Sequence, residues 1–329
     1  MKEPRDKSEN RLPVDEGREQ LMIRVARMAY LQDCSQTEIA NETGLNRWQV
    51  SRLLSEARDL GVVRIEIVPR SHRLPDLEAE LTRIFGLRDA VVVPGPATTM
   101  HIMDAVAQAA GQYLAAIKPR PSLIGVSWGR TMASVAHWLP LKWADGVEVV
   151  QINGTVAPVP QAAHHNDVAE TFARKGQGRF VPLPVPAIVG SRDTREVLEK
   201  DRIVDDVLRL ARSAPMLCFS FGALGAESAL LLSGNILPEE VKSLERAGAV
   251  GDILGRFINR RGEIVDAELD ARTIGLSFAD LKSRDRAIGV AAGAEKHETV
   301  TGALRAGLVN VLVTDEATAT YALEHAHDR

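Results

Sequence analysis

The sequence predicts an α/β protein made of two parts, an N-terminal winged helix-turn-helix domain followed by a Rossmann-like domain with a parallel sheet. Two capped, amphipathic helices meet at a glycine within residues 35–61, which is the pattern of a helix-turn-helix. From about Ala90 onward, short apolar strands alternate with helices, as in parallel α/β sheets. The 329 residues also exceed the length of one typical domain. We therefore expect a disordered arm over 1–17, the helix-turn-helix domain over 18–70 and the α/β domain over 71–329.

The composition narrows the class of protein before any motif is considered. The net charge is −4, and 12 Lys and Arg balance 12 Asp and Glu within residues 1–70, which excludes a basic nucleic-acid-binding tail. No apolar run reaches the roughly 18–20 residues of a membrane span, and the charged N-terminus lacks the apolar core of a signal peptide. The two cysteines, Cys34 and Cys218, have no metal-type spacing. We expect reduced thiols, no membrane contact and a cytoplasmic location.

The first domain is expected to contain three helices and one strand. Residues 18–31 carry an apolar face at helical spacing. SQTE at 35–38 is a capping box that opens the second helix, and Gly44 ends it. NRWQ at 46–49 repeats the capping box and opens the third helix. Residues 62–68 alternate apolar and charged side chains, which predicts a strand where a wing would follow the third helix.

The third helix has one apolar face and one polar face, so the polar face is free to enter a DNA major groove. Arg pairs well with guanine, Asn and Gln with adenine, and short hydroxyls with phosphates. Between Thr43 and Arg58 the sequence has three arginines and one acidic residue. This excess of positive charge favours binding to operator DNA over the alternative, an ordinary helical hairpin with a solvated face. Trp48 either packs under the wing or lies along the DNA backbone. The expected DNA-binding residues are Gln36, Thr37, Asn46, Arg47, Trp48, Gln49, Ser51 and Arg52.

The second domain begins with a helix and then alternates strands and helices. Strands are expected at 90–93, 122–126, 146–152, 180–185, 216–221, 250–257, 264–265, 286–291 and 309–314. Helices are expected at 75–85, 103–116, 130–139, 166–175, 194–200, 203–213, 238–247, 278–282, 295–306 and 315–325.

Ligands of open α/β sheets bind at the carboxyl ends of the strands, beside helix N-termini. Three strand-to-helix turns have the small and polar residues that an anion site needs: GVSWGRT at 125–131, QINGT at 151–155 and AGAEK at 292–296. The SFGALG run at 220–225 is a fourth strand end that carries glycine. Lys296 would oppose the dipole of its own helix, a conflict that a bound anion would offset, although a solvated surface lysine explains the same pattern.

Catalytic and metal patterns are not evident in the sequence. His164 and His165 are adjacent, so their side chains point in different directions, and no third ligand follows at a suitable spacing. Asp252, Asp266 and Asp270 do not form a catalytic pair by spacing, and neither a P-loop nor a nucleophile elbow is present. We therefore expect no catalytic residues, no metal and no cofactor.

Five stretches together resemble the SorC family of bacterial sugar-binding transcriptional regulators over nearly the whole chain. They are the helix-turn-helix at 35–61, GVSWGRT at 125–131, QINGT at 151–155, DILGRFINRRGEIVD at 252–266 and IGVAAGAEKHETVTGALRAGLVNVLVTDEATA at 288–319. The resemblance implies a C-terminal effector and oligomerisation domain similar to sugar-phosphate isomerases of the glucosamine-6-phosphate deaminase and ribose-5-phosphate isomerase type. It also implies a homotetramer and control by a sugar or phosphosugar.

The turns and the resemblance together give an expected effector site. Its residues are Ser127, Trp128, Gly129, Arg130, Thr131, Gly154, Asp252, Gly293 and Lys296. The amine of Lys296 would pair with a phosphate or, with a lowered pKa, form a Schiff base with a sugar aldehyde. Residues 158–180 depart from the family pattern, so the sequence does not identify the sugar.

We therefore expect a DNA-binding transcriptional regulator of carbohydrate metabolism genes whose operator binding is controlled by a sugar or phosphosugar. One alternative is a phosphosugar isomerase or deaminase with an attached DNA-binding module, which would need a base at the substrate carbon. A second alternative is a regulator that responds to a protein partner. Binding of small molecules, or turnover of a sugar phosphate, would separate the three.

Overall fold

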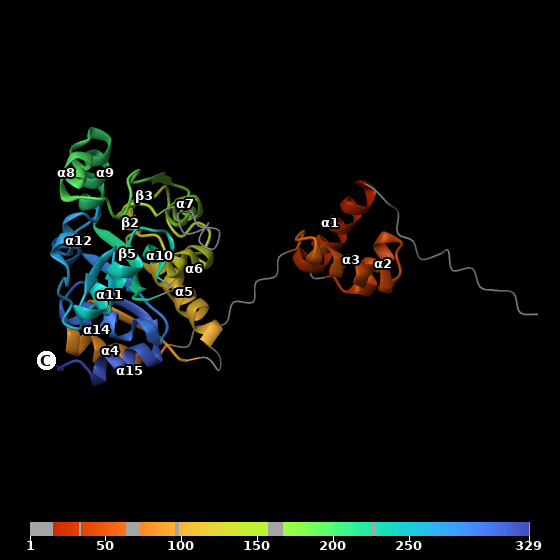
Figure 1. Cartoon of the computed structure of the whole chain (residues 1–329). Coiled ribbons are helices and arrows are strands. Elements are labelled where there is room, and N and C mark those ends of the chain that lie inside the picture. The colour runs from red at the N-terminus through yellow and green to blue at the C-terminus, as the bar shows by residue number, and fades with distance from the viewer. Residues whose placement is uncertain are drawn as a thin grey trace, which may run out of the picture. The chain divides into compact units, whose positions relative to one another are not determined.

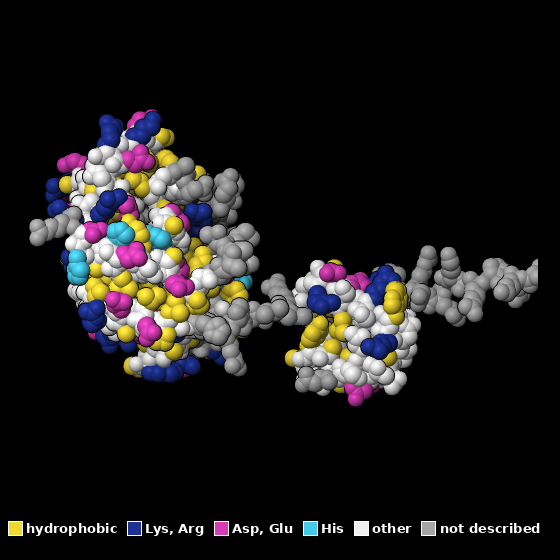
Figure 2. All heavy atoms as spheres, turned by 90° about the horizontal axis from the view of Figure 1, so that it is seen from below, with side chains coloured by type: hydrophobic (Ala, Val, Ile, Leu, Met, Phe, Trp, Pro, Cys, Tyr) yellow, Lys and Arg dark blue, Asp and Glu magenta, His cyan; other side chains and the backbone are white. Residues whose placement is uncertain are grey.

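The computed structural model describes residues 16–32, 34–63, 73–95, 99–156, 167–225 and 228–328. The chain divides into two compact units, Met1–Arg70 and Ser71–Arg329 (Figure 1). On the face of each unit shown in Figure 2, positive and negative side chains are interspersed, which agrees with a net charge of only −4. Neither unit therefore presents a field of one sign on that face.

The smaller unit consists of three helices, α1 (Glu16–Leu31), α2 (Gln36–Thr43) and α3 (Arg47–Asp59). The first helix begins two residues before the predicted start at Arg18. Apolar side chains from all three helices meet in one cluster, because each helix has an apolar stripe at the spacing of 3.6 residues per turn. Its buried members are Met22, Val25, Ala26, Met28, Ile39, Ala40, Val50, Leu53, Leu54 and Ala57.

Both predicted capping boxes are present in the smaller unit. The side chain of Ser35 accepts from the backbone N–H of Glu38 and the Glu38 side chain accepts from the backbone N–H of Ser35, and Asn46 and Gln49 form the same reciprocal pair. Gly44 ends α2 with a φ of 70°, a left-handed conformation that turns the chain sharply into α3. Most of the strand predicted over 62–68 lies outside the described residues, which stop at Val63 and resume at Arg73.

The larger unit is built on a sheet whose strands run in the order β1-β9-β8-β5-β2-β3-β4, all paired in parallel. Strand β5 continues beyond this sheet and pairs with an antiparallel hairpin made of β6 and β7. The strands are β1 (Asp89–Val93), β2 (Leu123–Val126), β3 (Glu148–Gln151), β4 (Arg179–Val181), β5 (Met216–Ala223), β6 (Gly251–Ile253), β7 (Arg256–Ile258), β8 (Arg286–Val290) and β9 (Val311–Asp315).

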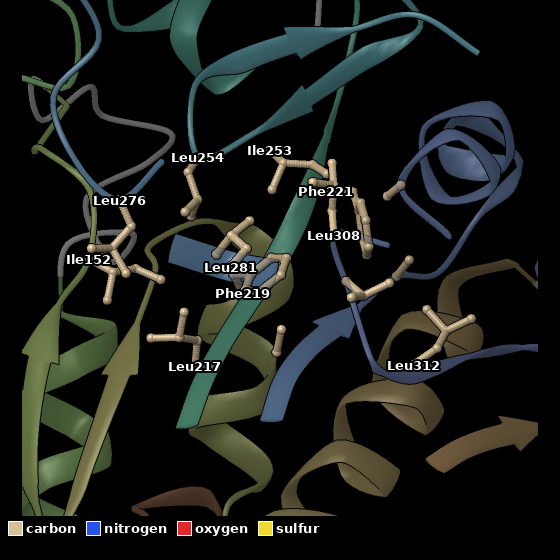
Figure 3. Close-up of a cluster of buried hydrophobic side chains, with 14 of the residues drawn as sticks. Ile152, Leu217, Phe219, Phe221, Ile253, Leu254, Leu276, Leu281, Leu308 and Leu312 are labelled. Atoms are coloured by element: carbon tan, nitrogen blue, oxygen red, sulfur yellow. The ribbon is translucent and has the colours of Figure 1, made fainter. Parts of the chain in front are cut away.

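Helices cover both faces of this sheet, so the unit has three layers (Figure 1). Successive side chains of a strand point to opposite faces, and here both sets are apolar: Val91 and Val93 pack on one face, while Val92 packs on the other. Helices α5, α6 and α7 cover the first face, and α4, α9, α14 and α15 cover the second, part of whose packing is drawn in Figure 3. The helices are α4 (Pro75–Phe85), α5 (Thr99–Ala116), α6 (Arg130–Trp138), α7 (Val168–Lys175), α8 (Arg192–Lys200), α9 (Arg202–Ser213), α10 (Ala229–Leu232), α11 (Pro238–Arg246), α12 (Ala267–Ala271), α13 (Phe278–Lys282), the 3₁₀ turn η3 (Ala294–Lys296), α14 (His297–Arg305) and α15 (Glu316–Glu324).

Most of the elements predicted for the larger unit are present, with local corrections. Residues 264–265 do not form the predicted strand, because Ile264 makes only an isolated bridge to Ile258. The strand predicted over 180–185 ends at Val181, because Pro182 and Pro184 have no N–H to donate to a ladder. The strand predicted over 250–257 is instead the hairpin of β6 and β7, with its turn at Leu254. The helix predicted from Glu295 begins as the 3₁₀ turn η3. The short helices α10 and α12 were not predicted, because one helical turn is too short to show a periodic pattern.

Candidate functional site

The polar face of α3 places several of the expected DNA-binding residues in solvent. Arg47, Trp48, Ser51 and Arg52 are all exposed, opposite the buried face of the helix. The Arg52 guanidinium lies 5.4 Å from the centroid of the Trp48 ring, a cation–π arrangement that orients both side chains. The Trp48 side chain is 53% exposed, and it is not packed into the core that the described residues of the smaller unit form.

The remaining expected DNA-binding residues lie at the starts of α2 and α3. Asn46 Oδ1 accepts from the Gln49 N–H at 2.9 Å, and Gln49 Oε1 accepts from the Asn46 N–H at 2.9 Å. Their side-chain oxygens therefore cap α3 and fix its first turn. On α2, Thr37 is exposed and Gln36 is half-buried. The eight residues thus gather around the start of α2 and one face of α3.

In the larger unit, a pocket lies at the carboxyl ends of the four adjacent strands β8, β5, β2 and β3. Its cavity volume is about 80 Å³, below the roughly 300–1,000 Å³ of sites for drug-sized ligands, so it suits a small metabolite. Seven of the nine expected effector-site residues line it: Ser127, Trp128, Gly129, Arg130, Thr131, Asp252 and Lys296. Segments distant in sequence therefore meet in one site.

Gly154 and Gly293, the other two expected effector-site residues, do not line this pocket. Each acts one step behind the pocket wall. The carbonyl of Gly154 accepts from Trp128 Nε1 at 2.7 Å, so it holds the indole ring in the wall. The N–H of Gly293 donates to Asp315 Oδ2 at 3.1 Å, which ties the turn before Lys296 to the start of α15.

The Lys296 ammonium reaches the pocket from the 3₁₀ turn after β8. Its side chain is buried, and Nζ donates to Thr131 Oγ1 at 2.7 Å, in the first turn of α6. The pKa of Lys296 is lowered to about 8, chiefly by burial and also by the positive charge of Arg130, against the opposing effects of Glu295, Asp315 and Asp252. At pH 7 about nine-tenths of the amine is still protonated, which favours pairing with an anion over Schiff-base formation.

Asp252 is the buried carboxyl group of the pocket. It lies in β6, and its Oδ2 accepts from the N–H of Gly255 at 2.9 Å, across the hairpin turn. Burial raises the pKa of Asp252 to about 6, against the opposing effects of that hydrogen bond and of Lys296. A Cβ atom at Gly222 would lie 1.8 Å from Asp252 Oδ1, so the close approach of β5 to this carboxyl group requires glycine there.

Sequence reasoning missed several residues that shape the site. Asn153, Ser220 and Gly222 line the pocket, although the QINGT and SFGALG runs that contain them were singled out. Arg256 was missed entirely, because an arginine in a strand pattern reads as a surface residue. Its side chain is only 3% exposed in its ion pair with Asp270.

The Arg256 guanidinium holds the loop of residues 270–276, which lies next to the pocket. It donates to Asp270 and to the carbonyl of Leu276, the latter at 3.1 Å. The same loop pairs with the end of β3, because Gly275 bridges to Asn153 and the carbonyl of Ile274 accepts from Gly154 at 3.0 Å. Arg256 is therefore a positioning residue for the QINGT turn.

The described residues offer no group of three or more His, Cys, Asp or Glu side chains placed to hold a metal ion. His164 and His165 lie outside those residues. Among the described helices, none combines the length and the apolar character needed to cross a membrane.

The chain is similar to known proteins in sequence and in fold. The family model described as "Putative sugar-binding domain" matches residues 70–324. The deoxyribonucleoside regulator of Bacillus subtilis (strain 168) is 33% identical over 307 residues, which cover 93% of this chain and 98% of that protein. The transcriptional regulator LsrR of Klebsiella pneumoniae is 32% identical over 324 residues, which cover 97% and 98%. The full-length sorbitol operon regulator SorC from Klebsiella pneumoniae matches in structure with a TM-score of 0.68 and 27% identity, over 92% of this chain and 98% of that one.

These relatives are similar along both units, and the family model covers most of the larger unit. The same GVSWGRT, QINGT and C-terminal runs that suggested the resemblance meet at the pocket described above. The chain therefore belongs to the SorC family of sugar-binding transcriptional regulators.

Proposed function

We propose that the protein is a transcriptional regulator of carbohydrate metabolism genes whose operator binding is set by a sugar or phosphosugar in the pocket of the larger unit. The observation that carries this proposal is the convergence of two cations on one helix N-terminus. Arg130 is the first residue of α6, and the buried Lys296 ammonium donates to Thr131 in the same helix turn, so two positive charges meet at one helix N-terminus. A bound anion such as a phosphate would offset both positive charges and accept from N–H groups at the N-terminus of α6.

The rest of the pocket suits the polyhydroxyl part of such a ligand. Asp252 and Asn153 offer side-chain oxygens, Ser127 offers a hydroxyl group, and Trp128 offers an apolar ring face for the C–H groups of a sugar. The names of two relatives support this class of ligand without agreeing on its identity. One is named for deoxyribonucleosides and the other for the sorbitol operon.

Control of DNA binding would follow from linkage. A ligand shifts the balance between a DNA-competent and a DNA-incompetent form only by the difference in its affinity for the two. We propose a cytoplasmic homotetramer, as the family resemblance implies, in which several helix-turn-helix units grip one operator. Such avidity is needed because residues 1–70 carry no net charge and each unit alone makes a modest electrostatic contribution.

We propose that Asp252 and Lys296 bind the effector and do not turn it over. Burial is the largest cause of the change in each pKa, and the named relatives are transcriptional regulators. Conversion of any tested sugar phosphate by the pure protein, followed by NMR, would contradict this and favour the isomerase or deaminase alternative.

The first test is a thermal-shift screen of the full chain against phosphorylated sugars, free sugars and polyols. A ligand at 100 times its dissociation constant should stabilise the larger unit by about 2.7 kcal/mol. Lys296→Met should weaken binding of a phosphorylated hit by roughly 10- to 100-fold, because it removes a charge-assisted hydrogen bond.

Lys282→Met is the matched control, since Lys282 is exposed in the last turn of α13 and does not line the pocket. It should leave ligand affinity within about twofold of wild type. A hit that Lys296→Met binds as tightly as wild type would remove Lys296 from the site. No hit across the panel would count against a sugar effector and favour control by a protein partner.

A further inference from the structure

Asn153 occupies a fixed place at the end of β3. Its carbonyl accepts from Gln151 Nε2 at 2.8 Å, and its backbone bridges to Gly275 on the loop that Arg256 holds. Its side chain is 3% exposed and lines the pocket. The amide group is therefore aimed at the ligand space from a backbone that is anchored on two sides.

The side-chain oxygen of Asn153 is buried without a hydrogen-bond partner among the described residues. The other buried side-chain atoms in that condition are all nitrogens, and none of their residues lines the pocket: Arg18, Gln108, Arg286, His297 and Arg305. A buried acceptor left unpaired costs about as much as a lost hydrogen bond, and folded proteins rarely retain one. An acceptor kept unpaired inside a ligand pocket points to a donor on the ligand.

The strand order places Asn153 beside the cations. Arg130 stands at the start of α6, after β2, and the Lys296 ammonium reaches the same helix start through Thr131. Asn153 follows β3, which pairs with β2, and neighbouring strands lie about 4.8 Å apart. The pocket therefore has its cations at one strand end and an unpaired acceptor at the next. A ligand whose anion meets the cations can present a hydroxyl donor to Asn153.

We propose that Asn153 accepts a hydrogen bond from a hydroxyl group of a sugar phosphate, and so distinguishes the sugar from its deoxy analogue. This inference rests on the proposed function and names the part of the ligand that one residue reads. An analogue that lacks the hydroxyl leaves Asn153 Oδ1 buried and unpaired, so the site rejects it. The phosphate end contributes equally to both ligands.

The test is isothermal titration calorimetry of the full chain and its Asn153→Leu variant. The probes are glucose 6-phosphate with its 2-deoxy and 1,5-anhydro analogues, ribose 5-phosphate with its 2-deoxy analogue, and inorganic phosphate. Wild type should prefer one hydroxylated sugar over its analogue by roughly 10- to 100-fold. Asn153→Leu should reduce that preference to less than about threefold, and both proteins should bind inorganic phosphate equally.

Asn153→Asp is the matched variant, because it keeps the shape and the acceptor and should retain the preference for the hydroxylated sugar. Equal discrimination in wild type and Asn153→Leu would overturn the assignment while leaving the proposed function intact. Failure of wild type to bind any of the sugar phosphates would count against the proposed function. It would also count against the proposed hydrogen bond between Asn153 and a ligand hydroxyl group.

A second measurement needs no ligand. Removing a buried acceptor that has no partner relieves an unfavourable term, so Asn153→Leu without ligand should melt at or above the temperature of wild type. A lower melting temperature for Asn153→Leu, with that of Asn153→Asp unchanged, would show that the oxygen is already paired in the free protein. That result would overturn the proposal whatever the titrations show.

Discussion

The two units of the chain hold their candidate residues in opposite ways. In the smaller unit, the residues expected to meet DNA lie at the start of α2 and along α3, and most of them are exposed. In the larger unit, the pocket draws on six separate segments between Ser127 and Lys296, and Asp252, Lys296 and Asn153 are all buried there. Exposed residues can change with little effect on folding, whereas buried polar residues tie function to stability.

Among the variants that test this contrast, Arg256→Met has the largest expected effect on stability. The variant leaves Asp270 without its buried partner and several backbone carbonyls without a donor, so the larger unit should lose about 3–5 kcal/mol of stability. Urea unfolding of the full chain would measure this loss. Arg209→Met is the control, because Arg209 makes exposed ion pairs on α9 and its removal should cost less than about 1 kcal/mol. Similar losses in the two variants would contradict the role of Arg256.

Asp252→Asn tests whether a pocket residue lowers stability. Burial raises the pKa of Asp252 from 3.8 to about 6, so the folded protein binds this proton more tightly than the unfolded chain does. The stability that the group contributes is complete below about pH 4 and is lost as the pH rises through about 6.

The variant should therefore match wild type near pH 4 and exceed it by roughly 1–3 kcal/mol at pH 7.5, as measured by urea unfolding across that range. Because other carboxyl groups titrate in both proteins, the difference between variant and wild type isolates Asp252. A difference that is constant with pH would contradict the raised pKa.

Arg47→Ala should have the smallest effect on folding and a clear effect on function. Loss of a bidentate base contact should weaken binding to an operator fragment, obtained by selection from random DNA, by about 1–3 kcal/mol. The unfolding free energy should stay within about 0.5 kcal/mol of wild type, because Arg47 is exposed. Fluorescence anisotropy with the selected and a scrambled fragment would measure both affinity and discrimination.

Arg58→Ala is the control in the last turn of α3, away from the start of the helix where bases are read. It should keep the ratio between selected and scrambled DNA. An Arg47 variant that keeps the same ratio would remove Arg47 from sequence recognition.

The contrast also explains what the sequence alone could predict. The capping boxes at Ser35 and Asn46 and the apolar stripe of α3 are local patterns, and the structure confirms them. The pocket was located through strand ends and a family resemblance, because the turn at 127–131 and Lys296 are far apart in sequence and join only through the strand order. The roles of DNA-binding and effector-binding residues stay predictions.

Residues whose importance depends on packing were not predictable. Gly154 holds Trp128 from behind the pocket wall, and Arg256 holds the loop behind Asn153. The local sequence around Gly154 or Arg256 does not show whether a residue lines the pocket or holds another residue that does. The unpaired oxygen of Asn153 can be recognised only after every neighbouring donor has been placed.

The hydrogen bond between Trp128 and the carbonyl of Gly154 has a practical consequence. It fixes an indole ring in the pocket wall with its N–H already engaged by the protein. A ligand that enters replaces water around that ring without changing its orientation, so the emission of this tryptophan should shift as the pocket fills. The chain therefore carries its own optical reporter of occupancy, and replacing Trp48, Trp138 and Trp143 by Phe would leave that signal as the only tryptophan emission.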